Sequence, residues 1–258
     1  MELKTISFQR LKTQQPSPTK RAPLRPTIKL ATTTTPDGHA LVLSQHDRDF
    51  YISVNGRQLM NSREHKSELE LARLGCHCVQ EREQAQVLIG GLGMGFTLRQ
   101  TLELVPQDAT VTVAELIPEV VDWNRNFLGG LTQYALQDQR VAVKSCDVLE
   151  IIHASAGIFD AILLDVDNGP GALTHANNDK LYRPAGLHAM MRALKKDGCL
   201  AIWSVARDMQ FESVLRQQKL HFRTFRAHAS KSSKSRSRCI WLIAQQKLAL
   251  PPASFFLN

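Results

Sequence analysis

The stretch VLIGGLGMGFTLRQTL, residues 87–102, joins a short apolar run to a helical pattern through a turn that contains Gly91, Gly93 and Gly95. The apolar run predicts a buried strand, and the spacing after the turn predicts a helix. Glycine permits a sharp turn and lets a ligand approach the backbone closely. Because no Gly-Lys-Ser/Thr sequence follows, the stretch is not a P-loop. The turn is either a ligand-binding loop or a tight turn that serves only the fold.

The chain downstream of this turn alternates short β-rich runs with helical runs. Strands are predicted at TVTVAEL (110–116), RVAVKS (140–145), FDAILLDV (159–166) and GCLAIWSV (198–205). This alternation is typical of a doubly wound parallel sheet with helices on both faces. After a helix around residues 209–217, the runs HFRTFRA (221–227) and SRCIWLIAQQ (237–246) follow without an intervening helix. We therefore expect the sheet to end in an antiparallel hairpin.

The segment upstream of the turn has the pattern of a small antiparallel β unit. HALVLSQHDRDFYISVNGRQLMNS (39–62) alternates apolar and polar residues and contains Asn55-Gly56, which favours a type I′ hairpin turn. We expect this unit at residues 28–61, followed by a helix at 64–74. The predicted domains are a basic, Pro-rich flexible arm (1–27), a small β-hairpin domain with its linking helix (28–80) and a doubly wound α/β domain (81–258).

The composition favours one α/β domain with a small appendage. The chain has 258 residues, 43% of them hydrophobic, and no apolar run is long enough to span a membrane. The N-terminal residues lack the apolar core of a signal peptide, so we expect a cytoplasmic protein. Five scattered cysteines predict reduced thiols. Cys76-His77-Cys78 has no second Cys/His pair at zinc spacing, and we predict no metal.

The net charge of +8 is concentrated in two segments. Basic residues crowd the arm at residues 1–27 and the run SKSSKSRSR (230–238). Such segments attract nucleic acid or an acidic partner through counterion release. Neither segment carries the interleaved aromatic residues that stack on bases. We therefore favour solvated segments over a nucleic-acid surface.

Three acidic residues follow predicted strands at the sheet edge where such folds bind ligands. Glu115 ends the second strand, about twenty residues beyond the glycine turn, where an acid accepts hydrogen bonds from ribose hydroxyls. Asp147 follows the third strand, where an acceptor meets the amino group of an adenine, and Asp165 closes the fourth. Each also has a simpler interpretation: a strand-end charge for Glu115, a helix N-cap for Asp147 and a turn residue for Asp165.

These motifs resemble those of the spermidine synthases, polyamine aminopropyltransferases that share the class I S-adenosylmethionine-dependent transferase fold. The resemblance runs from about residue 28 to 245 and includes SVNGRQLMNSRE (53–64), VAELIPEVV (113–121) and FDAILLDVDNGPG (159–171). It implies a small β-hairpin domain followed by a Rossmann-like, methyltransferase-type sheet. It also implies a catalytic role for Asp165 in assisting the substrate amine. The cofactor-binding residues that it implies are Gly91, Gly93, Gly95, Glu115 on the ribose and Asp147 on the adenine side.

The chain departs from the family's pattern at two acids. Recognition of a polyamine requires carboxylates that pair with its ammonium groups. The family's aspartate in the glycine turn is Met94 here, and the second aspartate of the fourth-strand motif is Asn168. Asp167 is an additional acid beside Asn168. The resemblance makes Asp167 and Asn168 candidate substrate-binding residues.

The helix before the glycine turn departs from the pattern as well. An ungapped match places Glu70 on the family's glutamate, but Leu69 on its histidine and Glu68 on its tyrosine. The same match puts Leu59 where the family has a ligand-contacting glutamine, with Gln58 alongside. Glu70 and Gln58 complete the candidate substrate-binding set.

Three functions remain open from the sequence. The resemblance implies transfer of an aminopropyl group from decarboxylated S-adenosylmethionine to a small-molecule amine, a diamine or polyamine, by a chain that forms a homodimer through its hairpin domain. The first alternative is a methyltransferase that uses intact S-adenosylmethionine. Methionine in place of the family's aspartate at position 94 favours it, because a cofactor with a carboxylate gains nothing from an aspartate beside that carboxylate. The second is a non-catalytic nucleoside-binding homologue whose basic arms engage an acidic partner.

Overall fold

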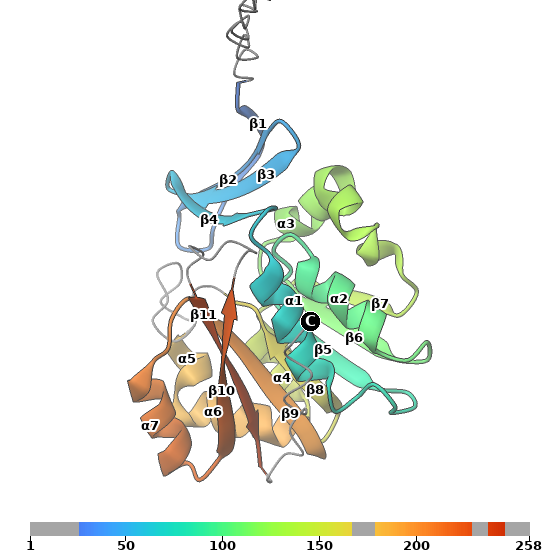
Figure 1. The fold of residues 1–258 in the computed structure, drawn as a ribbon, viewed down its shortest axis with the longest axis vertical. Helices are drawn as coiled ribbons and strands as arrows, with labels where there is room; N and C mark the ends of the chain where they lie inside the picture. The colour runs from blue at the N-terminus through green and yellow to red at the C-terminus, as the bar shows by residue number, and fades with distance from the viewer. Residues whose placement is uncertain (1–25, 167–178, 229–236, 246–258) are drawn as a thin grey trace, which may run out of the picture.

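The computed structural model describes residues 26–166, 179–228 and 237–245, which form a small sheet set above one edge of a larger sheet (Figure 1). The small sheet is antiparallel throughout, with strand order β1-β2-β3-β4. Asn55 and Gly56 have φ angles of 46° and 74° in the β3–β4 turn, which confirms the predicted hairpin. The strands are β1 (Ile28–Thr34), β2 (Ala40–His46), β3 (Asp49–Val54) and β4 (Arg57–Asn61).

The large sheet is mixed, with strand order β10-β11-β9-β8-β5-β6-β7. Its strands are β5 (Gln86–Gly90), β6 (Thr110–Ala114), β7 (Val141–Lys144), β8 (Phe159–Leu164), β9 (Leu194–Ser204), β10 (His221–His228) and β11 (Ser237–Ala244). Neighbouring strands among β5 to β9 pair in parallel, whereas β11 lies antiparallel between β9 and β10. The predicted doubly wound sheet with a terminal hairpin is thereby confirmed.

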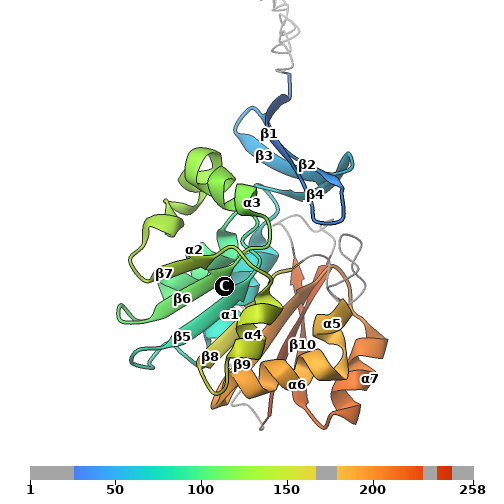
Figure 2. The same ribbon diagram turned by 180° about the vertical axis from the view of Figure 1, so that it is seen from behind.

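Helices cover both faces of the large sheet. They are α1 (Lys66–Cys76), α2 (Phe96–Leu104), α3 (Pro118–Trp123), α4 (Val148–Ala154), α5 (Asp179–Tyr182), α6 (Pro184–Ala193) and α7 (Met209–Gln217), with a π-helical turn η1 (Asn124–Leu128) and 3-10 turns η2 (Gly129–Thr132) and η3 (Ala135–Gln137). Figure 1 shows α1 and α2 on one face, and Figure 2 shows α4 and α6 on the other. No helix in the described ranges is long and apolar enough to cross a membrane.

The apolar runs of the sequence contribute side chains to two hydrophobic cores, one on each face of the large sheet, because side chains alternate between the faces of a strand. Val87 and Ile89 of β5 pack in the core that contains α1 and α2. Leu88, between them, packs in the core that contains α4 and α6. A parallel strand covered on both faces therefore reads as a continuous apolar run, as VLIGG does.

The register of the central strands brings their carboxyl ends to one edge. Gly90 of β5 pairs with Ala114 of β6 and with Leu164 of β8. Gly91 N donates to Ala114 O (2.8 Å), and Asp165 N donates to Gly90 O (2.8 Å). The glycine turn and the acid after β8 are thus tied together through the backbone.

The cysteines carry free thiols. Cys78 Sγ lies 3.1 Å from Cys199 Sγ, a contact between the segment after α1 and strand β9. Burial raises the pKa of the Cys76 thiol to about 12. Within the part of the chain that the structure describes, no group of three or more His, Cys, Asp or Glu side chains is placed to hold a metal ion.

A buried carboxylate connects α7 to the terminal hairpin. Glu212 accepts a bidentate pair of hydrogen bonds from Arg207 (2.6 and 2.8 Å) and single bonds from Arg216, Trp241 and Thr224. The Arg207 guanidinium, aided by the indole and hydroxyl donors, lowers the pKa of Glu212 to about 2. We expect Glu212→Gln to lower the free energy of unfolding at pH 7 by about 2–3 kcal/mol. This is the low end for a buried pair, because both guanidiniums are half exposed.

The same pKa fixes how this loss depends on pH. The depressed pKa means that Glu212 stabilises the fold above its ordinary value of 4.5 and loses that contribution as pH falls towards 2. Urea unfolding should therefore show a large difference between Glu212→Gln and wild type at pH 7 and a small one at about pH 3. Glu103→Gln, at a half-exposed side chain of α2, is the control. An equal loss at both pH values would show that Glu212 acts by packing alone.

Candidate functional site

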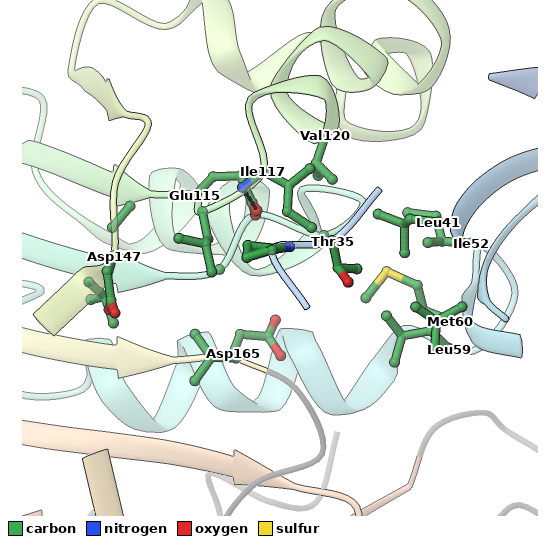
Figure 3. Close-up of a pocket in the computed structure, with 18 of the residues that line it drawn as sticks. Thr35, Leu41, Ile52, Leu59, Met60, Glu115, Ile117, Val120, Asp147 and Asp165 are labelled. Atoms are coloured by element: carbon green, nitrogen blue, oxygen red, sulfur yellow. Dashed lines mark hydrogen bonds between the residues drawn. The ribbon is translucent and has the colours of Figure 1, made fainter. Parts of the chain in front are cut away.

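The main cleft lies between the small sheet and the carboxyl edge of the large sheet (Figure 3). It has a volume of about 920 Å³, part of it open to solvent. Its polar wall comes from the strand ends and its apolar wall from the small sheet and the segment after β6. The strand ends and the turns after them contribute Gly91, Gly93, Glu115, Cys146, Asp147 and Asp165, Thr35 adds a hydroxyl, and the apolar lining residues include Leu41, Ile52, Leu59, Met60, Ile117 and Val120.

The glycine turn is held open by its backbone conformation and by one amide side chain. Gly91, Gly93 and Gly95 have φ angles of 88°, 52° and 83°, a region that favours glycine. Asn124, at the start of η1, donates from Nδ2 to Gly93 O (2.8 Å) and to Val120 O (2.9 Å). Gly91 and Gly93 line the cleft, whereas Gly95 begins α2 and lies against Asn124. No motif marks Asn124 in the sequence, because π-helical turns leave no simple pattern.

Glu115 is nearly buried and faces the cleft from the end of β6. Its Oε2 accepts from Leu92 N (2.8 Å), and its Oε1 accepts from Ile117 N (2.9 Å). These bonds orient the carboxylate, and each oxygen of a carboxylate can accept more than one hydrogen bond. Asp147 also lines the cleft, and its Oδ1 caps α4 by accepting from Leu149 N (2.9 Å). The N-cap and a place in the cleft are therefore compatible for Asp147.

Asp165 stands at the end of β8 and faces the centre of the cleft (Figure 3). Thr97 Oγ1, in the first turn of α2, donates to Asp165 Oδ2 (2.6 Å). Burial and, to a lesser extent, the nearby charge of Glu68 raise the pKa of Asp165 to about 7, against the opposing effect of the Thr97 hydrogen bond. A carboxylate with this pKa exchanges a proton readily near neutral pH.

The apolar wall was not identified from motifs. Leu41, Ile52, Leu59 and Met60 reach the cleft from β2, β3 and β4 (Figure 3). Alternation of apolar and polar residues predicts a buried face that includes Leu41 and Ile52, but not what that face covers. Leu59 and Met60 are consecutive, and both reach the cleft because the pairing of β3 with β4 is irregular at Leu59. The wall gives the cleft an apolar side opposite its carboxylates, a lining common in small-molecule sites.

Some predicted residues lie elsewhere. The side chain of Gln58 is exposed on β4, while its neighbour Leu59 lines the cleft. Glu70 lines a separate groove between α1 and strands β10 and β11, 3.4 Å from Arg73. Asp167 and Asn168 lie outside the described residues.

A small cavity adjoins the cleft, and we call it the acidic cavity. It is lined by Met60, Asn61, Glu68, Leu92, Gly93, Met94, Phe96 and Asp165. Met60, Gly93 and Asp165 also line the main cleft, so the two spaces share a wall. Glu68 reaches this cavity from α1 and is the second carboxylate beside the candidate catalytic acid. The match to a family tyrosine gave no indication of this role.

Comparison with known proteins gives a consistent set of relatives. The polyamine aminopropyltransferase of Oceanobacillus iheyensis is 28% identical over 170 residues, which cover 63% of this chain and 31% of the relative. That of Shouchella clausii is 31% identical over 114 residues, 43% of this chain and 38% of the relative. The chain thus spans less than two fifths of the length of these curated relatives.

Solved structures share the two-sheet fold. The spermidine synthase of Thermotoga maritima aligns with a TM-score of 0.66 at 17% identity, covering 88% of this chain and 75% of that one. A spermidine synthase in complex with the transition-state analogue AdoDATO aligns with a TM-score of 0.67 and the same identity and coverage. Residues 71–230 match the family model of the spermine/spermidine synthase domain. Since this match extends over more than half of the sequence, the chain belongs to the spermine/spermidine synthase family.

Proposed function

We propose that the protein is an aminopropyltransferase that moves the aminopropyl group of decarboxylated S-adenosylmethionine to the nitrogen of a diamine or polyamine. The observation that carries this proposal is the convergence of Gly91, Glu115, Asp147 and Asp165 on one cleft. A nucleoside fits the first three, and a reacting amine fits the fourth. Membership of the spermine/spermidine synthase family supports the same chemistry.

The donor's nucleoside would lie between the polar and apolar walls. The vicinal ribose hydroxyls would donate to Glu115, because hydrogen bonds to a carboxylate are stronger than neutral ones. Asp147, on the neighbouring strand end, would accept from the adenine amino group. The faces of the adenine would pack against apolar residues such as Ile117 and Val120, which flank Glu115 in the cleft.

The reaction is a displacement at carbon. The lone pair of the acceptor amine attacks the methylene carbon bonded to the sulfonium, and a new C–N bond forms. The C–S bond breaks, and its electron pair stays on sulfur, so methylthioadenosine leaves. The amine must be unprotonated to attack and sheds a proton afterwards. We assign to Asp165 the roles of holding the amine and accepting that proton, which its pKa of about 7 supports because it suits a general base near neutral pH.

The acceptor would enter from the side of Asp165. Asp167 and Asn168 follow Asp165 closely in the chain, and we retain them as candidates for acceptor binding. Gln58 and Glu70 do not line the cleft and have no part in this proposal. A homodimer formed through the small sheet is likewise a proposal, which the molecular mass in solution would test.

The nucleoside assignment predicts the effect of replacing Glu115. Glu115→Ala should weaken methylthioadenosine binding by about 10- to 100-fold, the loss expected for charge-assisted hydrogen bonds. Calorimetry with methylthioadenosine measures this loss. Glu115→Gln should bind with an intermediate affinity, because its amide keeps one acceptor oxygen for the turn. Glu119→Ala, at an exposed residue of α3, is the matched control. If Glu115→Ala bound methylthioadenosine with unchanged affinity, the ribose would not bind at Glu115.

A further inference from the structure

We propose that Glu68 is the specificity-determining residue of the cleft, the carboxylate that receives the ammonium group of the donor's aminopropyl arm and disfavours a donor carrying a carboxylate there. This inference rests on the proposed function. It names the residue that selects decarboxylated over intact S-adenosylmethionine. The observation behind it is that Glu68 and Asp165 line the same small cavity beside the cleft.

The acidic cavity and the main cleft share part of their walls. Gly93 and Met60 form part of the wall of both spaces, and Asp165 stands where the two meet. A nucleoside held by Glu115 in the cleft would have its sulfonium near Asp165. The chain attached to that sulfonium would then lie beside the acidic cavity, which Asp165 also lines. Glu68 of α1 lines this cavity and would supply a carboxylate to the end of the arm.

The first turn of α1 fixes Glu68 in this place. Ser67 Oγ donates to Glu68 Oε2 (2.6 Å), and the backbone N–H of Glu68 also interacts with this carboxylate. The ring of His65 stacks on Phe96, with centroids 4.1 Å apart and planes inclined by 13°. Asn61 Oδ1, at the end of β4, accepts from the backbone N–H groups of Arg63 and Glu64 (3.0 Å each). The start of α1 is therefore tied both to the small sheet and to α2.

The charges around Glu68 leave it in need of a cation. Burial is the main reason that the pKa of Glu68 is raised, and the negative charge of Glu64 adds to it. Asp165 is the other acid nearby, and Glu68 in turn raises the pKa of Asp165. Arg238 on β11 is the cation that acts on Glu68, but no ion pair joins the two within the described ranges. Two carboxylates that share a cavity repel each other, and a bound ammonium group would remove that repulsion.

Glu68 also explains how the site tolerates methionine in its glycine turn. Met94 is buried and lines the acidic cavity with its apolar side chain. The glycine turn supplies no aspartate to the acidic cavity, but Glu68 of α1 supplies a carboxylate there in addition to that of Asp165. The absence of an acid at Met94 therefore does not favour a donor that keeps its carboxylate. Such a donor would bring a further negative charge to a cavity lined by two carboxyl groups whose pKa values are both raised.

The test compares three ligands that differ at one end. Decarboxylated S-adenosylmethionine carries the ammonium alone, intact S-adenosylmethionine adds a carboxylate, and methylthioadenosine has neither. We expect wild type to bind the decarboxylated ligand at least about 10-fold more tightly than the intact one, and Glu68→Gln to lose most of this preference, as expected for one charged hydrogen bond. Methylthioadenosine affinity should stay within about 2-fold, because no contact to the nucleoside is removed. Glu103→Gln is the matched control, a glutamate of α2 outside both spaces.

Two further measurements keep the result decisive. Without ligand, Glu68→Gln should melt at a higher temperature than wild type at about pH 8, and this gain should fade as pH falls and the carboxyls take up protons. The double variant Glu68→Gln/Met94→Asp moves the carboxylate across the cavity and should regain part of the preference for the decarboxylated ligand.

The outcomes separate this inference from the proposed function. If Glu68→Gln keeps the wild-type preference, or lowers the affinity for all three ligands equally, Glu68 does not distinguish the two donors by their charge. Methylthioadenosine binding by wild type would still support the nucleoside cleft in that case. If Glu68→Gln melts below wild type at about pH 8, the two carboxylates do not repel and the inference fails. If wild type binds none of the three ligands, the proposed function and this inference both fall.

Discussion

Asp165→Asn should abolish most aminopropyl transfer while leaving methylthioadenosine binding intact. The amide keeps the shape of the side chain and its place beside Thr97, but it neither attracts an ammonium group nor accepts a proton. We expect turnover to fall by about 10²- to 10⁴-fold, the usual contribution of a positioned base. Release of methylthioadenosine from the decarboxylated donor measures the rate. Calorimetry with methylthioadenosine shows whether the cleft survives. Asp122→Asn, at an exposed aspartate of α3, is the control.

The same substitution should stabilise the ligand-free protein. The folded-state pKa of Asp165 is about 7, above its ordinary value of 3.8, so ionisation of this carboxyl destabilises the fold as pH rises between these values. The melting temperature of Asp165→Asn should therefore exceed that of wild type most at pH 7 and above. The rate of wild type should rise with pH through about 7, as Asp165 loses its proton. A fast Asp165→Asn variant would exclude Asp165 as the base.

Gly91→Ala should disrupt the site through the backbone. A Cβ at Gly91 would overlap the main-chain carbonyl oxygen of Asp165, and the φ angle of 88° is strained for alanine. Neither partner can move freely, because Asp165 N is bonded to Gly90 O (2.8 Å) at the adjoining strand end. We expect a loss of more than about 3 kcal/mol in the free energy of unfolding. The fraction of the variant that remains folded should not bind the nucleoside. Urea unfolding and calorimetry measure the two effects.

Gly38→Ala is the control that separates clash from backbone strain. Gly38 has a φ of 82°, close to that of Gly91, but nothing lies within 4 Å of the Cβ that alanine would add. Its cost should be about 1–2 kcal/mol, the penalty for a left-handed alanine. Equal losses at Gly38 and Gly91 would show that the contact with Asp165 contributes nothing.

The sequence predicts those residues of the site whose positions follow from the ends of the parallel strands. A parallel sheet places the carboxyl ends of its strands at one edge, so Glu115, Asp147 and Asp165 converge once the strands are identified. The structure brings all three to the main cleft, together with Gly91 and Gly93. Their roles towards a ligand stay predictions. The fold class followed from the same strands and from the two β-rich runs at 221–227 and 237–246, between which the sequence has no helical pattern.

The rest depends on which face of an element a residue occupies. Glu68 and Glu70 are two positions apart, about 200° around a helix, so only one of them can face the cleft side of α1. The ungapped match favoured Glu70, which faces the groove beside β10, whereas Glu68 faces the acidic cavity. Gln58 and Leu59 differ by one position in a strand and point to opposite faces. Matches made by residue type do not contain this geometry, which is set by how α1 and β4 pack.

The most direct test of aminopropyl transfer is a product assay with purified protein and two donors in parallel. Decarboxylated S-adenosylmethionine with putrescine or spermidine should release methylthioadenosine and extend the amine by one aminopropyl unit. Intact S-adenosylmethionine with the same amines should give neither that product nor S-adenosylhomocysteine. If no amine yields methylthioadenosine while the intact donor binds tightly and is converted to S-adenosylhomocysteine, the protein transfers methyl groups and the proposed function is wrong.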